Sequence, residues 1–174
     1  MIFQEILRAD HIYLKQLLVE EVNETYVNWL KDPAINKFLE VRHNPPTLSE
    51  QIKYVLQCID SKDIVLFGIF LINNRLIGTM KLSFSNTSSG EIGIMVGDKS
   101  MQGIGIGKSA VGLIKAWAIK NDLLTLTAGY DVKNIASAKL FKSLGFKKYK
   151  KNSNSLLANQ DIDTERVLLD LTKV

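Results

Sequence analysis

The segment 101–109 reads MQGIGIGKS and carries three glycines at alternate positions. A short apolar strand pattern precedes this segment, and an amphipathic helix pattern follows it. Because glycine has no Cβ, its backbone N–H groups can approach a ligand closely, and the first turn of a helix adds unpaired amides and the positive end of a dipole. The segment therefore predicts a phosphate-binding loop that joins a strand to a helix.

Three phosphate-binding motifs compete for the segment, and their spacing distinguishes them. A P-loop needs a glycine where Gln102 stands, although residues 107–109 match its last three positions. The dinucleotide fingerprint G-x-G-x-x-A matches 105–110, and Asp131 lies at the end of the next strand pattern. That fold, however, turns directly from strand into glycine, and the short remainder of the chain after Asp131 lacks its repeated strands and helices.

The third motif, Q/R-x-x-G-x-G/A, is met by Gln102, Gly105 and Gly107. With this motif the chain resembles the GCN5-related N-acetyltransferase (GNAT) family, whose loop of this form holds the pyrophosphate of acetyl-coenzyme A. A second block at 134–146 is similar to the N-x-x-[AS]…GF helix of that family and stands at the expected distance. The resemblance covers nearly the whole chain and implies an acetyl-CoA-dependent N-acetyltransferase without a metal cofactor.

The composition indicates a single globular domain. The 174 residues are 46% hydrophobic, enough for a core, and we expect one N-acetyltransferase domain over 1–174. No apolar stretch is long enough to cross a bilayer, and the N-terminus lacks a basic region followed by an apolar one. We therefore expect a cytoplasmic protein without a membrane partner.

Two features that could carry other functions have simpler explanations. The single cysteine, Cys58, falls within a helical pattern and is expected to be a buried structural thiol. The basic run at 147–151 could contact the 3′-phosphate of a coenzyme or a nucleic acid, but lysines also deter the pairing of a strand edge. We favour the protected strand edge and do not expect nucleic acid as a partner.

Hydrophobic periodicity predicts an α+β fold with a mixed, mostly antiparallel sheet of about seven strands, flanked by about four helices. Strands are expected at 11–17, 65–72, 75–84, 91–96, 123–130, 146–151 and 166–171. Helices are expected at 22–30, from Thr47 onward, after the glycine loop and at 134–145. The helix after the loop is expected to cross between parallel strands at 91–96 and 123–130.

Local signals mark the ends of these elements. Asp32 and Pro33 end the first helix, and Asn73 and Asn74 suit the positive φ of a hairpin turn. A capping box of Thr47 and Glu50 starts the second helix, with a buried stripe of Ile52, Val55, Leu56 and Ile59. The helix after the glycine loop should bury Ala110, Val111, Ile114, Trp117 and Ala118. Asn134 and Gly145 suit the two ends of the last helix.

The family resemblance implies that the strands at 91–96 and 123–130 splay apart and admit the pantetheine arm. Backbone amides near Met95 and Val96 would then serve the pantetheine carbonyls and the thioester oxygen. Asn134 is expected to bind pantetheine or to cap its helix. The cofactor-binding residues that we predict are Met95, Val96, Gln102, Gly103, Gly105, Gly107, Lys108, Ser109, Asn134 and Phe141.

The implied reaction is the attack of a neutral amine on the acetyl thioester, which requires a base for the ammonium and a proton for the leaving thiolate. Glu91, at the start of the splayed strand, is the predicted base, with His43 and Asp131 as reserves. Family members often have a tyrosine where this chain has Phe141, which cannot donate a proton. Ser137, Tyr130 or solvent could supply that proton instead.

The N-terminal half should select the acceptor. The segment 26–35 is similar in sequence to members of the RimJ/RimL-type branch, which acetylate protein N-termini, antibiotics or small amines. Together with 40–43 and 127–130, it is similar to members associated with the acetylation of amino sugars. Trp29, Arg42 and His43 are the predicted acceptor contacts. A nucleotide-linked amino sugar is the favoured acceptor, and a protein N-terminus or an antibiotic is the alternative. A non-catalytic coenzyme-sensing or nucleic-acid-binding module is the alternative function, and a homodimer is possible.

Overall fold

The computed structural model describes residues 3–152 and 164–173. Its strands form one mixed sheet in the order β1-β2-β3-β4-β5-β6-β8-β7. They are β1 (Leu7–Arg8), β2 (Ile12–Gln16), β3 (Ile64–Leu71), β4 (Leu76–Asn86), β5 (Ser89–Val96), β6 (Thr125–Asp131), β7 (Lys147–Asn152) and β8 (Thr164–Asp170). The α-helices are α1 (Glu24–Lys31), α2 (Pro33–Asn36), α3 (Leu48–Asp60), α4 (Ile106–Lys120) and α5 (Ile135–Ser143). Short 3₁₀ turns are η1 (Val19–Glu21), η2 (Glu40–His43), η3 (Lys99–Met101) and η4 (Leu171–Lys173).

The predicted fold class and order of elements are confirmed. Neighbouring strands are antiparallel except β5 and β6, which are parallel and are connected by α4. Two short elements were not predicted. β1 has only two residues, too few to show a periodic pattern. α2 forms because Pro33, which ends α1, also suits the first turn of a new helix, where the Asp32 side chain accepts the Ala34 N–H at 2.9 Å.

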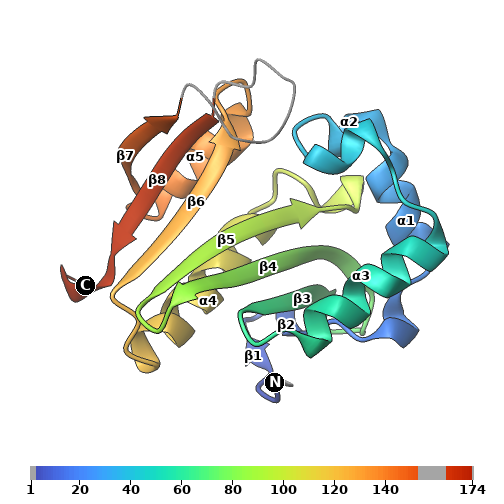
Figure 1. The fold of residues 1–174 in the computed structure, drawn as a ribbon, viewed down its shortest axis with the longest axis horizontal. Helices are drawn as coiled ribbons and strands as arrows, with labels where there is room; N and C mark the ends of the chain where they lie inside the picture. The colour runs from blue at the N-terminus through green and yellow to red at the C-terminus, as the bar shows by residue number, and fades with distance from the viewer. Residues whose placement is uncertain (1–2, 153–163, 174) are drawn as a thin grey trace.

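The helices cover both faces of the sheet (Figure 1). α4 and α5 pack with strands β2–β6 and β8 in one hydrophobic cluster, which includes Ile92, Ile114 and Phe141. α1 and α3 pack on the opposite face in a second cluster, which includes Tyr26, Val55 and Met95. Alternate residues of β5 therefore face different helix pairs, as the pleat of a strand requires.

The buried stripe of α3 was predicted partly wrongly. The capping box of Thr47 and Glu50 is present, but Leu56 is 44% exposed. The side chains that are buried are Gln51, Val55 and Cys58, because their spacing of four and three residues places them on one helical face. Gln51 is tolerated there because its amide donates to the Tyr26 hydroxyl at 3.0 Å.

The inner face of α4 was predicted correctly for Ala110, Val111, Ile114 and Ala118, which are fully buried. Trp117 is half-buried at the rim of the same cluster, where its ring packs beside Phe3 and its Nε1 donates to Glu5 at 3.3 Å. The buried state of Cys58 is also confirmed, and burial raises the pKa of its thiol. No helix within the described residues is both long and apolar enough to cross a bilayer.

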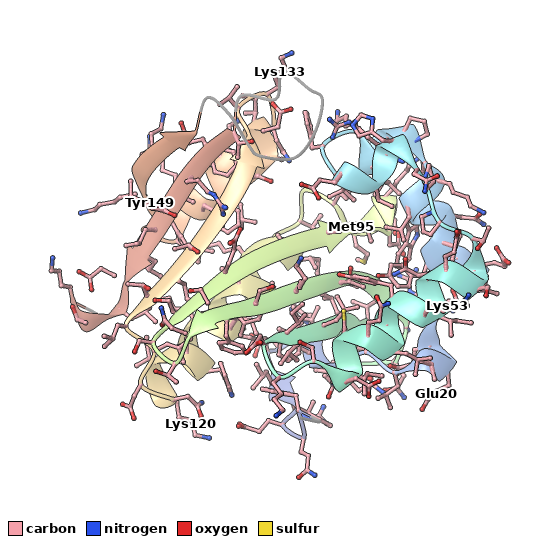
Figure 2. The ribbon with its side chains drawn as sticks, viewed as in Figure 1. Glu20, Lys53, Met95, Lys120, Lys133 and Tyr149 are labelled. Carbon is pink, nitrogen blue, oxygen red and sulfur yellow. The ribbon has the colours of Figure 1, made fainter. Side chains whose placement is uncertain are left out.

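β7, which contains the basic run, is the outermost strand at its edge of the sheet. Tyr149 on this strand is 51% exposed at the outer side of the molecule (Figure 2). Lys148 pairs with Glu165 of β8 at 2.5 Å. The prediction that the basic run lies on an edge strand is therefore confirmed for the described sheet.

β5 and β6 are paired over only part of their length. Their parallel ladder runs from Ser89 opposite Thr125 to Ile92 opposite Ala128. Beyond this point β5 continues beside β4 and β6 continues beside β8. We call the point where the two strands part the fork, and Figure 1 shows them diverging from it. The predicted splay is thus present.

Candidate active site

Two of the loop glycines adopt backbone conformations that other residues rarely adopt. Gly103 has φ +76°, and Gly105, which precedes the first residue of α4, has φ +94°. A Cβ added at either position would meet no atom within 4 Å. The backbone conformation, and not crowding, therefore requires glycine here, and no described residue occupies the space beside these two glycines.

The first turn of α4 presents donors and a positive side chain to this space. The Ser109 N–H is bonded to the Gly105 carbonyl at 3.0 Å. The three amides before it belong to the first turn of the helix, where backbone N–H groups have no partner within the helix. Lys108 and Ser109 are both exposed. This turn has the donors and the dipole that an anionic group such as a pyrophosphate needs.

Gly107 and Gln102 have mainly structural contacts. A Cβ on Gly107 would lie 3.3 Å from Cδ2 of Leu140, so this glycine allows α4 to approach α5 closely. The Gln102 side chain donates from Nε2 to the Val96 carbonyl at 2.8 Å, which ties the loop to the end of β5. The motif alone predicted neither the packing of Leu140 at Gly107 nor the bond from Gln102 to Val96.

The backbone at the fork supplies donors in a different register from the predicted one. The N–H of Gly97 bonds to Ile77 of β4 at 2.9 Å. Because antiparallel bonding alternates along a strand, the Met95 amide also faces β4, and the amides of Ile94 and Val96 face the opening beyond the fork. The Met95 side chain packs with α1 and α3 near the end of β5 (Figure 2).

α5 begins beside the fork with the predicted cap. The Asn134 side chain accepts the N–H of Ser137 at 3.1 Å, so its amide group is partly committed to the helix. Ser137 is half-buried one turn before Phe141. The Phe141 ring is buried, stacks on Tyr130 with ring centroids 6.0 Å apart, and meets Phe146 edge-on.

Tyr130 has a defined hydroxyl partner. Its hydroxyl donates to the Glu165 carboxylate on β8. Partial burial and this carboxylate raise the pKa of Tyr130 to about 12. Because β8 lies on the side of β6 away from β5, the hydroxyl is directed away from the fork.

Glu91 lies on β5 at the fork, and its side chain is 48% exposed. One of its oxygens accepts a hydrogen bond from Nη1 of Arg166 on β8, a residue that sequence reasoning did not single out. Asp131, the reserve base, accepts the Lys133 N–H at 2.8 Å and so caps the turn that follows β6.

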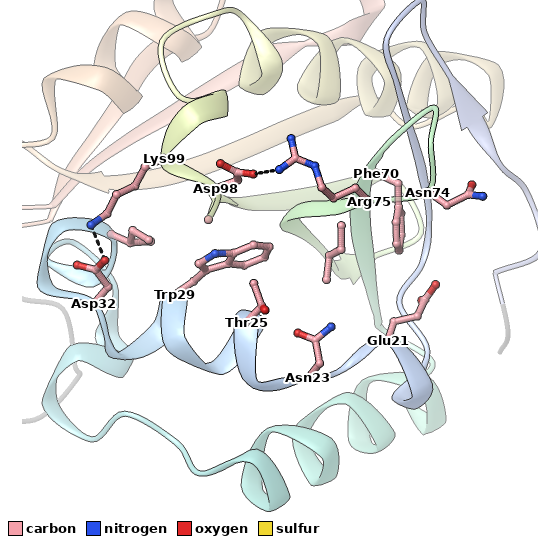
Figure 3. A pocket seen from close by; sticks show the side chains of 13 residues that line it. Glu21, Asn23, Thr25, Trp29, Asp32, Phe70, Asn74, Arg75, Asp98 and Lys99 are labelled. Carbon is pink, nitrogen blue, oxygen red and sulfur yellow. Dashed lines mark hydrogen bonds and ion pairs between the residues drawn. The ribbon is translucent and has the colours of Figure 1, made fainter.

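The predicted acceptor residues lie apart from Glu91. Trp29 packs on Gly97 and lines a hollow of about 760 Å³ between α1, the end of the β3–β4 hairpin and the segment 97–99. Figure 3 shows two ion pairs in its wall, Lys99 with Asp32 and Arg75 with Asp98, each at 2.6 Å. None of Glu91, Tyr130 and Ser137 lines this hollow.

Arg42 and His43 lie in η2. The Arg42 guanidinium donates from Nη1 to the Leu39 carbonyl at 2.9 Å, while His43 is exposed. No group of three or more histidine, cysteine or acidic side chains that could hold a metal ion occurs among residues 3–152 and 164–173.

A family model for the acetyltransferase (GNAT) domain matches residues 11–147 of this chain. An uncharacterized protein of Methanocaldococcus jannaschii is 31% identical over 142 residues, which cover 80% of this chain and 29% of that relative. The chain thus spans less than a third of the length of that relative.

Solved structures share the fold at lower identity. Spermidine N-acetyltransferase of Vibrio cholerae, solved with CoA and spermine, is 17% identical with a TM-score of 0.79, over 93% of this chain and 96% of that chain. The RimL ribosomal L7/L12 α-N-protein acetyltransferase, in complex with coenzyme A, is 18% identical with a TM-score of 0.83, over 95% of this chain and 98% of that chain.

Proposed function

Because the chain belongs to the acetyltransferase (GNAT) domain family, and so is an acetyl-CoA-dependent N-acetyltransferase, we propose that it acetylates the primary amine of a small, negatively charged molecule. A nucleotide-linked amino sugar is the acceptor that we favour. The proposal is carried by the charges beside the fork, on the face of the sheet that bears α1 and α3.

Among the described residues, two cations and two carboxylates lie on this face at the fork or just beyond it. Lys81 is exposed on β4 opposite Gly93, and Arg166 reaches over from β8. Of the carboxylates, Glu91 is paired with Arg166, and Asp131 accepts the Lys133 N–H. A polyamine would require carboxylates free to pair with its ammonium groups, whereas the exposed Lys81 suits a phosphate while Arg166 is held by Glu91. A phosphate-bearing acceptor therefore fits this face better than spermidine does.

The segments with similarity to amino-sugar acetyltransferases lie on β6, which runs past the fork, and in η2. Residues 127–130 belong to β6 and run past the fork, and residues 40–43 form η2. Figure 1 shows α2, which leads into η2, at the same end of the molecule as the end of β6. The Arg42 guanidinium has donors beyond the one that bonds Leu39, and we assign it to an acceptor phosphate.

The loop and the fork offer the acetyl donor room beside two glycines and backbone donors that face away from β4. Gly103, Gly105, Lys108 and Ser109 would hold the pyrophosphate, because the space beside the two glycines is free. The amides of Ile94 and Val96 would bind the pantetheine and the thioester oxygen. The thioester supplies an acetyl carbon that an amine can attack and a sulfur that leaves as a thiolate.

Glu91 accepts the proton that the acceptor ammonium must lose, directly or through a water molecule, before its nitrogen bonds to the acetyl carbon. When the carbon–sulfur bond breaks, the sulfur needs a proton. We assign this role to Ser137 or solvent ahead of Tyr130, because the Tyr130 hydroxyl donates to Glu165.

A panel of amines, assayed by release of the coenzyme A thiol, tests the acceptor class. It should contain amino-sugar nucleotides, the same sugars without a nucleotide, spermidine, an aminoglycoside and a short peptide. We expect turnover of the amino-sugar nucleotides and a higher KM for the free sugars. Turnover of spermidine or the peptide, with none of the amino-sugar nucleotides, would overturn the proposal.

Two variants separate the roles of the loop and of the base. Gly105→Trp should abolish coenzyme A binding in calorimetry, because the indole would fill the free space beside the loop. Glu91→Gln should keep coenzyme A binding and lower kcat by about a hundredfold. The matched control is Glu5→Gln, which removes an exposed carboxylate near Trp117, away from the fork. Unchanged turnover in Glu91→Gln would exclude Glu91 as the base.

A further inference from the structure

The Arg166 side chain reaches Glu91 across an intervening strand. Arg166 of β8 is opposite Gly129 of β6, and Glu91 lies on β5, the strand beyond. A Cβ built on Gly129 would lie 3.4 Å from both Cδ and Nη1 of Arg166. The guanidinium therefore passes directly over a residue that has no side chain.

This crossing occurs at the fork. Ile92 and Ala128 form the last pair of the β5–β6 ladder, and Gly129 is the first residue of β6 beyond it. Ile92 and Ala128 are buried under α4 and α5, so Glu91 and Gly129 face the opposite side of the sheet. Gly93 faces that side too, and a Cβ there would meet only the Lys81 side chain, at 4.0 Å.

Beside the pair of Glu91 and Arg166, the floor is bare backbone at Gly93 and Gly129. This ion pair connects β5 with β8, which are separated in the sheet by β6. Their side chains are 48% and 29% exposed. An ion pair this exposed adds little to stability, so its main physical effect is to restrict the orientation of the Glu91 carboxylate.

We propose that Arg166 is a positioning residue for acetyl transfer, which holds the Glu91 carboxylate at the fork, and that Gly129 is the residue that lets the arginine side chain cross β6. This inference rests on the proposed role of Glu91 as the base. A flexible glutamate on an exposed strand has several rotamers, and a base displaced by about 1 Å can cost a hundredfold in rate. A planar guanidinium fixes a carboxylate more firmly than an ammonium does.

Three variants of the whole chain test the inference with the best acceptor from the amine panel. Arg166→Gln should lower kcat by about tenfold or more, with the KM for acetyl-CoA unchanged. Arg166→Lys should recover part of this loss, because a lysine can still pair with Glu91. Gly129→Val should lower kcat in the same way although the arginine is kept, because the valine side chain occupies its path.

The double variant Glu91→Gln/Arg166→Gln should be no slower than Glu91→Gln alone, since both changes act on one group. Lys120→Gln, which removes an exposed partner of Glu5, is the matched control and should keep wild-type kcat. Calorimetry with coenzyme A and thermal unfolding should show that each variant is folded.

Wild-type kcat in Arg166→Gln, or a loss that adds fully to that of Glu91→Gln, would overturn the positioning role. Wild-type turnover in Glu91→Gln would overturn both the assignment of Glu91 as the base and the positioning role of Arg166. Failure of the amino-sugar nucleotides alone would remove the proposed acceptor but leave the Arg166 series measurable on the amine that is acetylated.

Discussion

The indole of Trp29 lies directly against Gly97: a Cβ built on this glycine would be 2.1 Å from Cδ2 and 2.2 Å from Cε3 of the ring. Gly97 follows the last residue of β5, and its N–H bonds to Ile77 of β4. The contact therefore joins α1 to the segment that leads into the phosphate-binding loop. Trp29 has an immediate structural role, whatever it contributes to acceptor binding.

Gly97→Ala should lower the free energy of unfolding by about 1 to 3 kcal/mol, because the added methyl group has no room beside the indole. It should also weaken coenzyme A binding, since the loop begins only a few residues later. Thermal unfolding and calorimetry measure the two effects. The control is Gly112→Ala within α4, where a Cβ meets nothing within 4 Å; alanine there should stabilise by up to about 1 kcal/mol. A fully stable Gly97→Ala would disprove the contact.

Gly105→Ala and Gly145→Ala form a matched pair, because both replace a glycine with φ near +90° by a residue that is strained there. Each should lose about 1 to 2 kcal/mol of stability. Only Gly105→Ala should weaken coenzyme A binding, because Gly145 ends α5 away from the loop. Calorimetry distinguishes them, and equal affinities would show that the Gly105 backbone does not contribute to the cradle.

Asp98 should make the stability of the protein depend on acid pH. Hydrogen bonds from the hydroxyl and N–H of Ser100, together with Arg75, hold the pKa of Asp98 below its ordinary value of 3.8. The unfolded chain therefore binds this proton at a higher pH than the folded chain does. The contribution is present above about pH 4 and is lost as the pH falls below it.

Asp98→Ala should consequently be less stable than the wild type at neutral pH, and the difference should shrink as the solution is acidified. Urea unfolding at a series of pH values measures it. A difference that stays constant down to pH values below 3.8 would mean that the charge of Asp98 contributes nothing.

Tyr130→Phe should leave kcat close to the wild-type value, because the hydroxyl that it removes is turned toward Glu165 of β8. The ring stacking on Phe141 should persist, since it needs no hydroxyl. Steady-state kinetics beside Ser137→Ala test this assignment. A loss of about tenfold or more in Tyr130→Phe, with little in Ser137→Ala, would identify Tyr130 as the proton donor.

Sequence patterns predicted the elements that carry strong local signals. The caps at Thr47 and Asn134 and the Asn73–Asn74 turn have chemical requirements that few residues meet, and Asn74 indeed has φ +67°. The glycine loop was located for the same reason, because Gly103 and Gly105 need positive φ. Predictions of this kind depend only on neighbouring residues.

Contacts between distant strands could not be predicted in this way. Arg166 reaches Glu91 only because β8 and β6 align it with Gly129, and no local pattern contains that register. The amide register at Ile94 and Val96 likewise depends on how β4 pairs with β5. Leu56 was misplaced because an apolar residue next to a buried stripe cannot be assigned to a helical face by its type alone.

The four-pair ladder between β5 and β6 is also a seam between two lobes. β1–β5 lie on one side of it and β6, β8 and β7 on the other, with α4 packed beneath. Few backbone bonds hold this seam, so the two lobes are joined mainly by the hydrophobic cluster that they share around α4. The separation of β5 and β6 beyond the fork is thus set by side-chain packing in one core and not by a ladder of backbone bonds.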